Sequence, residues 1–186
     1  FIDLYGNDIA DLRPLDGLTG LESLHLSYTG VDDIGALSGL TNLTELDLAH
    51  NNITDLSALS GLTGLEILNL NGNAITSIEP LAGMGAMKRL HLADNDIGSS
   101  VALEAMNDLE RLNLSGNGGL GAAGFAALAG KSSLERLNLY GIGITGVVPA
   151  VLAGLTGLKS LDLGGNAITN LGNLASLTGL ETLKIG

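Results

Sequence analysis

Two consecutive stretches of the chain share one pattern: LTELDLAHNNITDLSALSGLTG at residues 43–64 and LEILNLNGNAITSIEPLAGMGA at residues 65–86. Each begins with L-x-x-L-x-L, has Asn at its ninth position and has Ile two residues later. The alternation of Leu with other residues predicts a short β-strand whose alternate side chains point inward. The shared length of 22 residues predicts that each stretch is one unit of a repeat protein.

The same pattern extends from these two stretches in both directions and covers the chain. Taking the first Leu of each unit as position 1, units begin at Leu21, Leu43, Leu65, Met87, Leu109, Leu134, Leu158 and Leu180, and Ile2–Leu4 ends an earlier one. Asn occupies the ninth position at Asn7, Asn51, Asn73, Asn95, Asn117 and Asn166, whereas Thr29 and Ile142 interrupt the row. We therefore expect a single domain over residues 1–186 with about eight units.

These motifs resemble the leucine-rich repeat family over essentially the whole chain. The 22-residue units resemble most the internalin-like bacterial class. The unit at 134–157, with ITGVVP at 144–149, is similar to plant-type repeats, and the unit at 109–133, with GAAGFAALAG at 121–130, is similar to Gly/Ala-rich bacterial repeats. The resemblance implies an α/β repeat solenoid: a curved, right-handed array with a parallel β-sheet on its concave face and short 3₁₀, turn or helical segments on its convex face.

The same architecture follows from the physical properties of the repeat. No single unit can bury its Leu side chains alone, so stability has to come from contacts between neighbouring units. The Asn at the ninth position lies where the chain leaves the strand, and its amide can pair with backbone groups of the turn. We therefore interpret the Asn row as structural. Outer segments such as 55–61 are expected to form short 3₁₀ or turn structure, and Phe125–Ala129 is expected to form a helical turn or two.

Composition excludes several classes of protein. With 45% hydrophobic residues and no Gly at every third position, the chain is neither disordered nor collagen-like. Its apolar stretches are too short to insert into a membrane, and its net charge of −12 disfavours nucleic acid as a partner. The absence of Cys excludes disulfides and thiolate metal sites. Since aromatic residues make up only 3%, we expect an aliphatic core, with Phe125 on the outer side.

One surface gathers the residue types that are common in binding sites. Positions 2, 3, 5, 7 and 8 of each unit are expected to face the concave side. All three Tyr and all three His occupy these positions: Tyr5, Tyr28, Tyr140, His25, His50 and His91. Because interfaces are enriched in aromatic residues and Arg, this face is the candidate ligand-binding surface.

A first patch lies in the N-terminal units. Position 5 places Asp3, His25 and Asp47 on consecutive strands, and position 8 places Tyr28 and His50 on adjacent ones. Strands in a sheet lie about 4.8 Å apart, so these side chains are near neighbours. The ordinary interpretation is a solvated charge ladder. A pH-sensitive contact is one alternative. A divalent metal site is another, disfavoured because an open, flat ladder rarely completes a coordination shell.

A second patch is formed by position 3 of later units, where Arg89, Arg111 and Arg136 follow one another. Glu110 and Glu135 stand next to them in sequence. The ordinary interpretation is a set of mutual surface salt bridges, each of small energetic value. The functional alternative is a clamp for an anion or a carboxylate, because Arg binds such groups through two parallel hydrogen bonds. Tyr140 beside this ladder can then serve as a stacking wall.

No catalytic motif is present in the sequence. There is no Cys nucleophile, no G-x-S-x-G and no phosphate-binding loop, and the His residues follow the repeat rather than a Ser nucleophile. We therefore predict a non-catalytic scaffold, without metal or cofactor, that binds a protein or a glycan. The resemblance to internalin-like repeats implies an extracellular or cell-surface recognition or adhesion module. Two alternatives remain open: an intracellular scaffold or regulatory subunit, and a filament or matrix subunit that assembles end to end.

The terminal units show no polar cap. Residue 1 falls at the third position of a unit and residue 186 at the seventh. Terminal repeats normally carry a polar outer face, because the Leu side chains of the last unit are otherwise exposed. We therefore expect further repeats in the same chain, or self-association through the ends.

Overall fold

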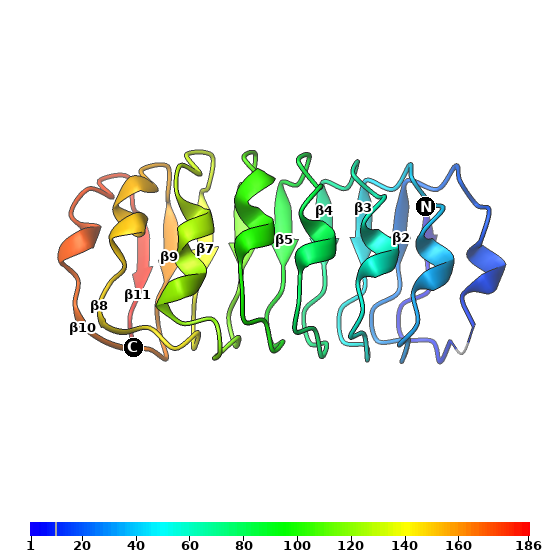
Figure 1. The fold of residues 1–186 in the computed structure, drawn as a ribbon, viewed down its shortest axis with the longest axis horizontal. Coiled ribbons are helices and arrows are strands. Elements are labelled where there is room, and N and C mark those ends of the chain that lie inside the picture. The colour runs from blue at the N-terminus through cyan, green and yellow to red at the C-terminus, as the bar shows by residue number, and fades with distance from the viewer. Residues whose placement is uncertain (10) are drawn as a thin grey trace.

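The repeats stack into an elongated solenoid with strands along one face and short helices along the other (Figure 1). The computed structural model describes residues 1–9 and 11–186. One rung of the solenoid follows another in sequence order from the N-terminus to the C-terminus (Figure 1). The predicted parallel sheet, short outer helical turns and curved α/β repeat solenoid are therefore confirmed.

The main sheet contains nine parallel strands within the described residues. In spatial order they are β1 (Ile2–Asp3), β2 (Ser23–His25), β3 (Glu45–Asp47), β4 (Ile67–Asn69), β5 (Arg89–His91), β6 (Arg111–Asn113), β7 (Arg136–Asn138), β9 (Ser160–Asp162) and β11 (Thr182–Lys184). The register matches equivalent repeat positions, so that Leu46 lies between Leu24 and Leu68. Residues at one repeat position therefore form a row across the sheet.

The opposite face is built from 3₁₀ helices, in agreement with the prediction for the outer segments. They are η1 (Arg13–Leu15), η2 (Gly35–Leu37), η3 (Ser57–Leu59), η4 (Glu79–Leu81), η5 (Val101–Ala105), η6 (Ala122–Leu128), η7 (Ala150–Gly154) and η8 (Gly172–Leu174). The longest of them, η6, belongs to the 25-residue unit and contains most of the segment predicted as helical, Phe125–Ala129. Extra residues in this unit are thus accommodated on the outer side.

A second, small sheet was not predicted. Strands β8 (Thr145–Val147) and β10 (Ala167–Asn170) pair in parallel in the C-terminal units, outside the main sheet. The Val148 N–H donates to the Asn170 carbonyl at 3.0 Å, and the Ala167 N–H donates to the Ile144 carbonyl at 2.9 Å. Thr145 and Val147 are β-branched and favour extended backbone, so this part of the rung is a strand rather than a turn.

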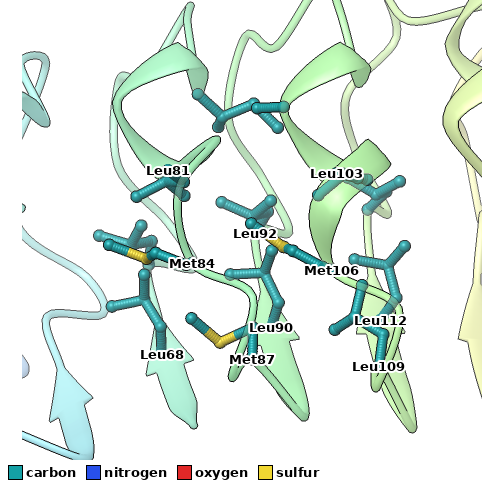
Figure 2. Packing of buried hydrophobic residues seen from close by; sticks show 14 of the residues in the cluster. Leu68, Leu81, Met84, Met87, Leu90, Leu92, Leu103, Met106, Leu109 and Leu112 are labelled. Atoms are coloured by element: carbon teal, nitrogen blue, oxygen red, sulfur yellow. The ribbon is translucent and has the colours of Figure 1, made fainter. Parts of the chain in front are cut away.

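The core is a continuous column of aliphatic side chains between the sheet and the outer helices. Figure 2 shows Leu90 between Leu68 and Leu112, its equivalents on the two neighbouring rungs. All three Met residues, Met84, Met87 and Met106, are fully buried in this column. The expectation of an aromatic-free core was wrong in one place, because Phe125 is only 2% exposed. Its helix lies on the outer side, but its ring points inward, where it fills space in a rung rich in small residues.

Candidate binding face

The concave face is defined here by the side chains that point outward from the nine-stranded sheet. In strands β2 to β6 the middle residue is buried and its two neighbours are half-buried. Positions 3 and 5 thus form this face, as the alternation of a strand requires. Position 7 departs from the prediction in several units, since Ser27, Ala49 and Ala93 are buried. Tyr5 and Tyr140 at that position are exposed, and Asn71 and Ser115 are half-buried.

The Asn row holds neighbouring rungs together below this face. The Asn51 side chain donates through Nδ2 to the carbonyls of Leu26 at 2.8 Å and Leu48 at 2.9 Å, which belong to successive rungs. Its Oδ1 accepts from the Thr29 and Val31 N–H groups at 3.0 and 3.2 Å. Such bonds satisfy backbone groups that would otherwise be buried without partners.

The same inter-rung pattern recurs at Asn73, Asn95, Asn117 and Asn166. Asn7 differs, because it is exposed and its Nδ2 donates only to the carbonyls of Leu4 and Tyr5 in its own rung. Where Thr29 replaces Asn, its hydroxyl donates to the Leu26 carbonyl at 2.7 Å. The same hydroxyl lies 3.1 Å from Asn51 Oδ1, and Asn51 supplies the amide bond between this rung and the next.

Three aromatic rings lie in contact on the N-terminal rungs, and we call Tyr5, Tyr28 and His50 the aromatic ledge. The Tyr5 and Tyr28 ring centroids are 5.7 Å apart in an edge-on arrangement. The Tyr28 and His50 rings are stacked, with centroids 4.3 Å apart and an interplanar angle of 20°. Tyr5 is 62% exposed and Tyr28 is 53% exposed. The sequence predicted that Tyr28 and His50 are neighbours, and the ledge brings Tyr5 to them.

The backbone beneath this ledge is left-handed. Position 8 has a positive φ in each of eight rungs, and Gly occupies it at Gly6, Gly72, Gly116, Gly141 and Gly165. The exceptions are Tyr28 with φ of 57°, His50 with 55° and Asp94 with 55°. A left-handed conformation costs a residue other than Gly about 1 kcal/mol or more. The chain therefore retains two rings of the ledge at positions where Gly is the conformationally favoured residue.

Carboxylates accompany the ledge on the same rungs. The side chain of His25 lies between Asp3 and Asp47 in the sheet register, as predicted, and its Nε2 is 3.5 Å from Glu45 Oε1. The Phe1 ring meets the His25 ring edge-on at 5.1 Å between centroids. Asp47 Oδ1 accepts the Ala49 N–H at 2.9 Å, which fixes this carboxylate at the end of its strand.

The predicted arginine ladder is present, with Arg111 paired in register with Arg89 on one side and Arg136 on the other. The salt bridges expected for it do not form: within residues 1–9 and 11–186, no carboxylate lies within 4.0 Å of these three guanidinium groups. Of the two acids next to the ladder in sequence, Glu135 pairs with Lys159 at 2.5 Å, and Glu110 takes part in none of the ion pairs among the described residues. Lys88 pairs with Glu66 of the preceding rung at 2.7 Å. The ladder thus keeps its charge uncompensated by close contacts.

His91 lies beside the ladder at position 5 of β5. Burial lowers the pKa of this imidazole below its usual value of 6.5, and the positive charges of Arg111 and Arg89 lower the pKa further. The Asp47 carboxylate acts in the opposite direction and offsets part of this shift in pKa. Neutral His91 is therefore the favoured form next to the guanidinium groups.

A hollow of about 280 Å³ opens on the concave face at the ladder. Its polar lining comes from His91, Arg111, Asn113, Arg136, Asn138, Ser160, Asp162 and Lys184. Asp162 is partnered by Lys184, with 3.5 Å between Oδ2 and Nζ. Tyr140 does not line this hollow as the stacking wall we expected. Its ring lies over Gly165 of the next rung, where an added Cβ would be 2.8 Å from Cζ.

The described part of the chain shows neither a metal cluster nor a membrane helix. No group of three or more His, Asp or Glu side chains is arranged there to hold a metal ion. The ladder of Asp3, His25 and Asp47 is in register but does not converge on one point. No helix among the described residues is long and apolar enough to cross a bilayer.

The fold and this face define a class: a solenoid of stacked repeats that presents a broad, open sheet surface. Family models for leucine-rich repeats match residues 41–83 in one case and residues 18–38, 105–129 and 155–174 in the other, together more than half of the sequence. The chain therefore belongs to the leucine-rich repeat family. No protein with a curated functional description matches this sequence.

Solved structures of internalins are similar over nearly the whole chain. The internalin InlF of Listeria monocytogenes is 32% identical with a TM-score of 0.74, over 99% of this chain and 59% of that protein. Internalin C2 of the same species is 28% identical with a TM-score of 0.70, over 98% of this chain and 69% of that one. The PEPR1–AtPEP1 structure has a TM-score of 0.86 at 24% identity, over all of this chain and 28% of that one, and shows the shared fold.

Proposed function

We propose that the protein is a non-catalytic recognition module that binds a protein ligand on its concave face. The observation that carries the proposal is the aromatic ledge, in which Tyr28 and His50 remain exposed although both occupy left-handed positions. Backbone strain retained at exposed side chains is typical of functional positions. Exposed Tyr provides a large contact area at low entropic cost, which suits a protein interface.

The comparisons support an extracellular or cell-surface setting for this module. The internalin InlF, at 32% identity, is the comparison on which this setting rests. The chain covers 59% of InlF, so a role in adhesion at a cell surface is part of the proposal. The arginine ladder and the hollow beside it extend the candidate surface towards the C-terminal rungs.

The proposal is tested with a variant built from residues that the repeat itself uses at the same positions. Tyr5→Ser and Tyr140→Ser copy Ser27 and Ser115, and Tyr28→Gly and His50→Gly copy the Gly of the other rungs. Because these residues already fit the fold, this face variant is expected to remain folded. Peptides selected from a random display library on the unmodified protein are then titrated into it.

We expect the selected peptides to lose at least about tenfold in affinity for the face variant, equivalent to one or two contacts of an interface. A matched control carries Val101→Ser and Val147→Ser, two exposed apolar residues that lie outside the main sheet. This control is expected to bind with unchanged affinity. Equal binding by the face variant and the unmodified protein would contradict the assignment of the concave face.

A further inference from the structure

The two patches of the concave face have opposite chemistry. Residues 1–87 contain 12 of the 20 acidic residues and one of the eight basic residues. From residue 88 onwards the chain contains the other seven basic residues together with eight acidic residues. The aromatic ledge lies in the first part and the arginine ladder in the second. The concave face therefore has an acidic, aromatic end and a second end, called the basic end, that carries the three Arg of the ladder.

The acidic end has the composition of a site for a cation. Cationic side chains bind to the faces of Tyr rings, and nearby carboxylates add attraction that depends on distance. The ledge offers exposed rings of Tyr5 and Tyr28, and Glu45 and Asp47 lie on the third rung with His50. The one basic residue of this half, Arg13, lies on the outer side in η1, where it pairs with Asp11 at 2.8 Å.

The basic end has the composition of a site for carboxylates. Each Arg of the ladder presents a guanidinium that can bind a carboxylate through two hydrogen bonds. Arg111 and Arg136 line the 280 Å³ hollow, so a side chain entering it meets both groups. Neighbouring strands lie about 4.8 Å apart, so three consecutive Arg extend over about 10 Å. This length matches two or three acidic side chains along an extended segment.

The spacing of the two ends sets the length of a bound segment. His50 and Arg111 belong to rungs three strands apart, or about 14 Å, and Tyr28 and Arg136 belong to rungs five strands apart, or about 24 Å. An extended chain advances about 3.3 Å per residue, so these distances correspond to about four to seven residues.

Resting on the proposed function, we propose that the concave face binds an extended protein segment of opposed charge, with basic side chains on the aromatic ledge and acidic side chains on the arginine ladder. The charge asymmetry orients the segment along the solenoid axis, because the reversed placement sets acid against acid and base against base. Complementary potentials of this kind determine orientation and partner choice more than they determine total affinity.

The test uses two synthetic peptides of identical composition. In the polar peptide, two Arg and three Asp are separated by five Ser and Gly residues; in the mixed peptide, the same charged residues alternate. We expect the polar peptide to bind at least about tenfold more tightly at low salt, with the difference decreasing as salt is added. A nitroxide on its acidic end is expected to broaden the amide NMR signals of residues 88–140, and a nitroxide on its basic end those of residues 1–52.

Variants assign each end to its residues. Arg111→Gln with Arg136→Gln is expected to weaken binding of the polar peptide at least about fivefold, whereas Arg13→Gln, the same change on the outer side, is expected to leave it unchanged. Tyr28→Gly with His50→Gly is expected to weaken binding as well. Its matched control is Asp94→Gly, which relieves the third left-handed residue at a site outside the ledge.

The outcomes separate this inference from the function on which it rests. Equal affinity for the polar and mixed peptides, or broadening of the same signals by both nitroxides, would overturn the opposed-charge proposal. If the library peptides still lose affinity for the face variant in that case, the concave face remains the binding surface. If they do not, the proposed function fails as well.

Discussion

The imidazole of His50 stacks on the phenol ring of Tyr28 with 4.3 Å between ring centroids, and both residues have a positive φ. The two rings are equivalent side chains of adjacent rungs, so their contact is a direct product of the 22-residue period. Stacked rings on adjacent rungs form a flat, exposed surface that Gly at the same positions would not provide. The cost of the left-handed backbone and the gain of the stacked rings can be measured separately.

Replacement of Tyr28 by Gly and by Ala separates these two terms. Both variants lose the ring contact, worth about 0.5–1.5 kcal/mol, but only Gly relieves the left-handed backbone, worth about 1 kcal/mol. We expect Tyr28→Gly to unfold with a free energy within about 1 kcal/mol of the unmodified protein, and Tyr28→Ala to be about 1 kcal/mol less stable than Tyr28→Gly. Urea denaturation followed by circular dichroism measures both. Equal stability of the two variants would show that φ at this position carries no cost.

The Asn row provides a second prediction, with a matched control in the first rung. Asn117 is completely buried, and its side chain donates to the Leu92 carbonyl of one rung and the Leu114 carbonyl of the next, both at 2.9 Å. Its Oδ1 accepts the Ile97 N–H at 3.0 Å. Asn117→Ala leaves these groups buried without partners, so we expect a loss of about 2–4 kcal/mol in unfolding free energy. Asn7→Ala removes an exposed side chain and is expected to cost less than about 1 kcal/mol.

Hydrogen exchange distinguishes this mechanism from a general loss of packing. In Asn117→Ala, the amide of Ile97 loses its acceptor, so its protection is expected to decrease more than that of Leu92, whose N–H donates to the Asn113 carbonyl. Uniform loss of protection across the chain would instead indicate that the rungs unfold as one unit and that the side-chain bonds have no local effect.

The period of the sequence was sufficient to predict the fold, because one residue at one repeat position has the same environment in each rung. The strands β2 to β6 follow the L-x-L segments, and the outer 3₁₀ helices lie where short turns were expected. The sheet β8–β10 was missed because the Leu pattern that marks the main sheet gives no signal for a second pairing, which joins β8 of the 24-residue unit to β10 of the regular 22-residue unit that follows it. The inward position of Phe125 was missed because position in the repeat was used without considering the small side chains around it.

The sequence predicted which residues of the candidate site lie in one row across the sheet, but not which side chains are in contact. Register alone placed Arg89, Arg111 and Arg136 side by side. The absence of carboxylates at these groups depended on rotamers, since Glu135 turns to Lys159 instead. The left-handed backbone at position 8 had a signal in the sequence, because Gly recurs there while Tyr28, His50 and Asp94 interrupt it. That row of Gly is the feature from which the strain could have been inferred.

His91 provides a prediction on pH. Burial and the charge of Arg111 hold its pKa in the folded protein below 6.5. Between that lowered pKa and 6.5 the folded state binds fewer protons than the unfolded state, so its contribution to stability is complete above pH 6.5 and is lost as the pH falls through this window. His91→Asn, which copies Asn69, Asn113 and Asn138 at position 5, is expected to flatten the pH profile of the melting temperature in this range.

Nuclear magnetic resonance titration of the His91 ring tests the cause of this shift. In Arg111→Gln the pKa of His91 is expected to rise, because a repelling positive charge has been removed, but to remain below 6.5, because burial is the larger cause. Arg13→Gln removes the same charge on the outer side and is expected to leave the titration curve of His91 unchanged. An unaltered curve in Arg111→Gln would show that the ladder does not influence this imidazole.

Lys131 provides a prediction of the same sign at alkaline pH. Its side chain is 1% exposed, and its Nζ donates to the Met106 carbonyl at 3.0 Å and the Glu104 carbonyl at 3.5 Å. Burial lowers the pKa of Lys131 below 10.5, with the Glu104 carboxylate acting in the opposite direction. The folded state therefore binds fewer protons than the unfolded state between the lowered pKa and 10.5, and Lys131 contributes a gain in stability as the pH rises through this window.

We expect the unfolding free energy of the unmodified protein to increase relative to that of Lys131→Met as the pH is raised from 8 to about 10.5. The other Lys and Tyr residues are common to both proteins, so their titrations cancel in the difference. A difference in unfolding free energy that is independent of pH would show that Lys131 keeps its ordinary pKa in the fold.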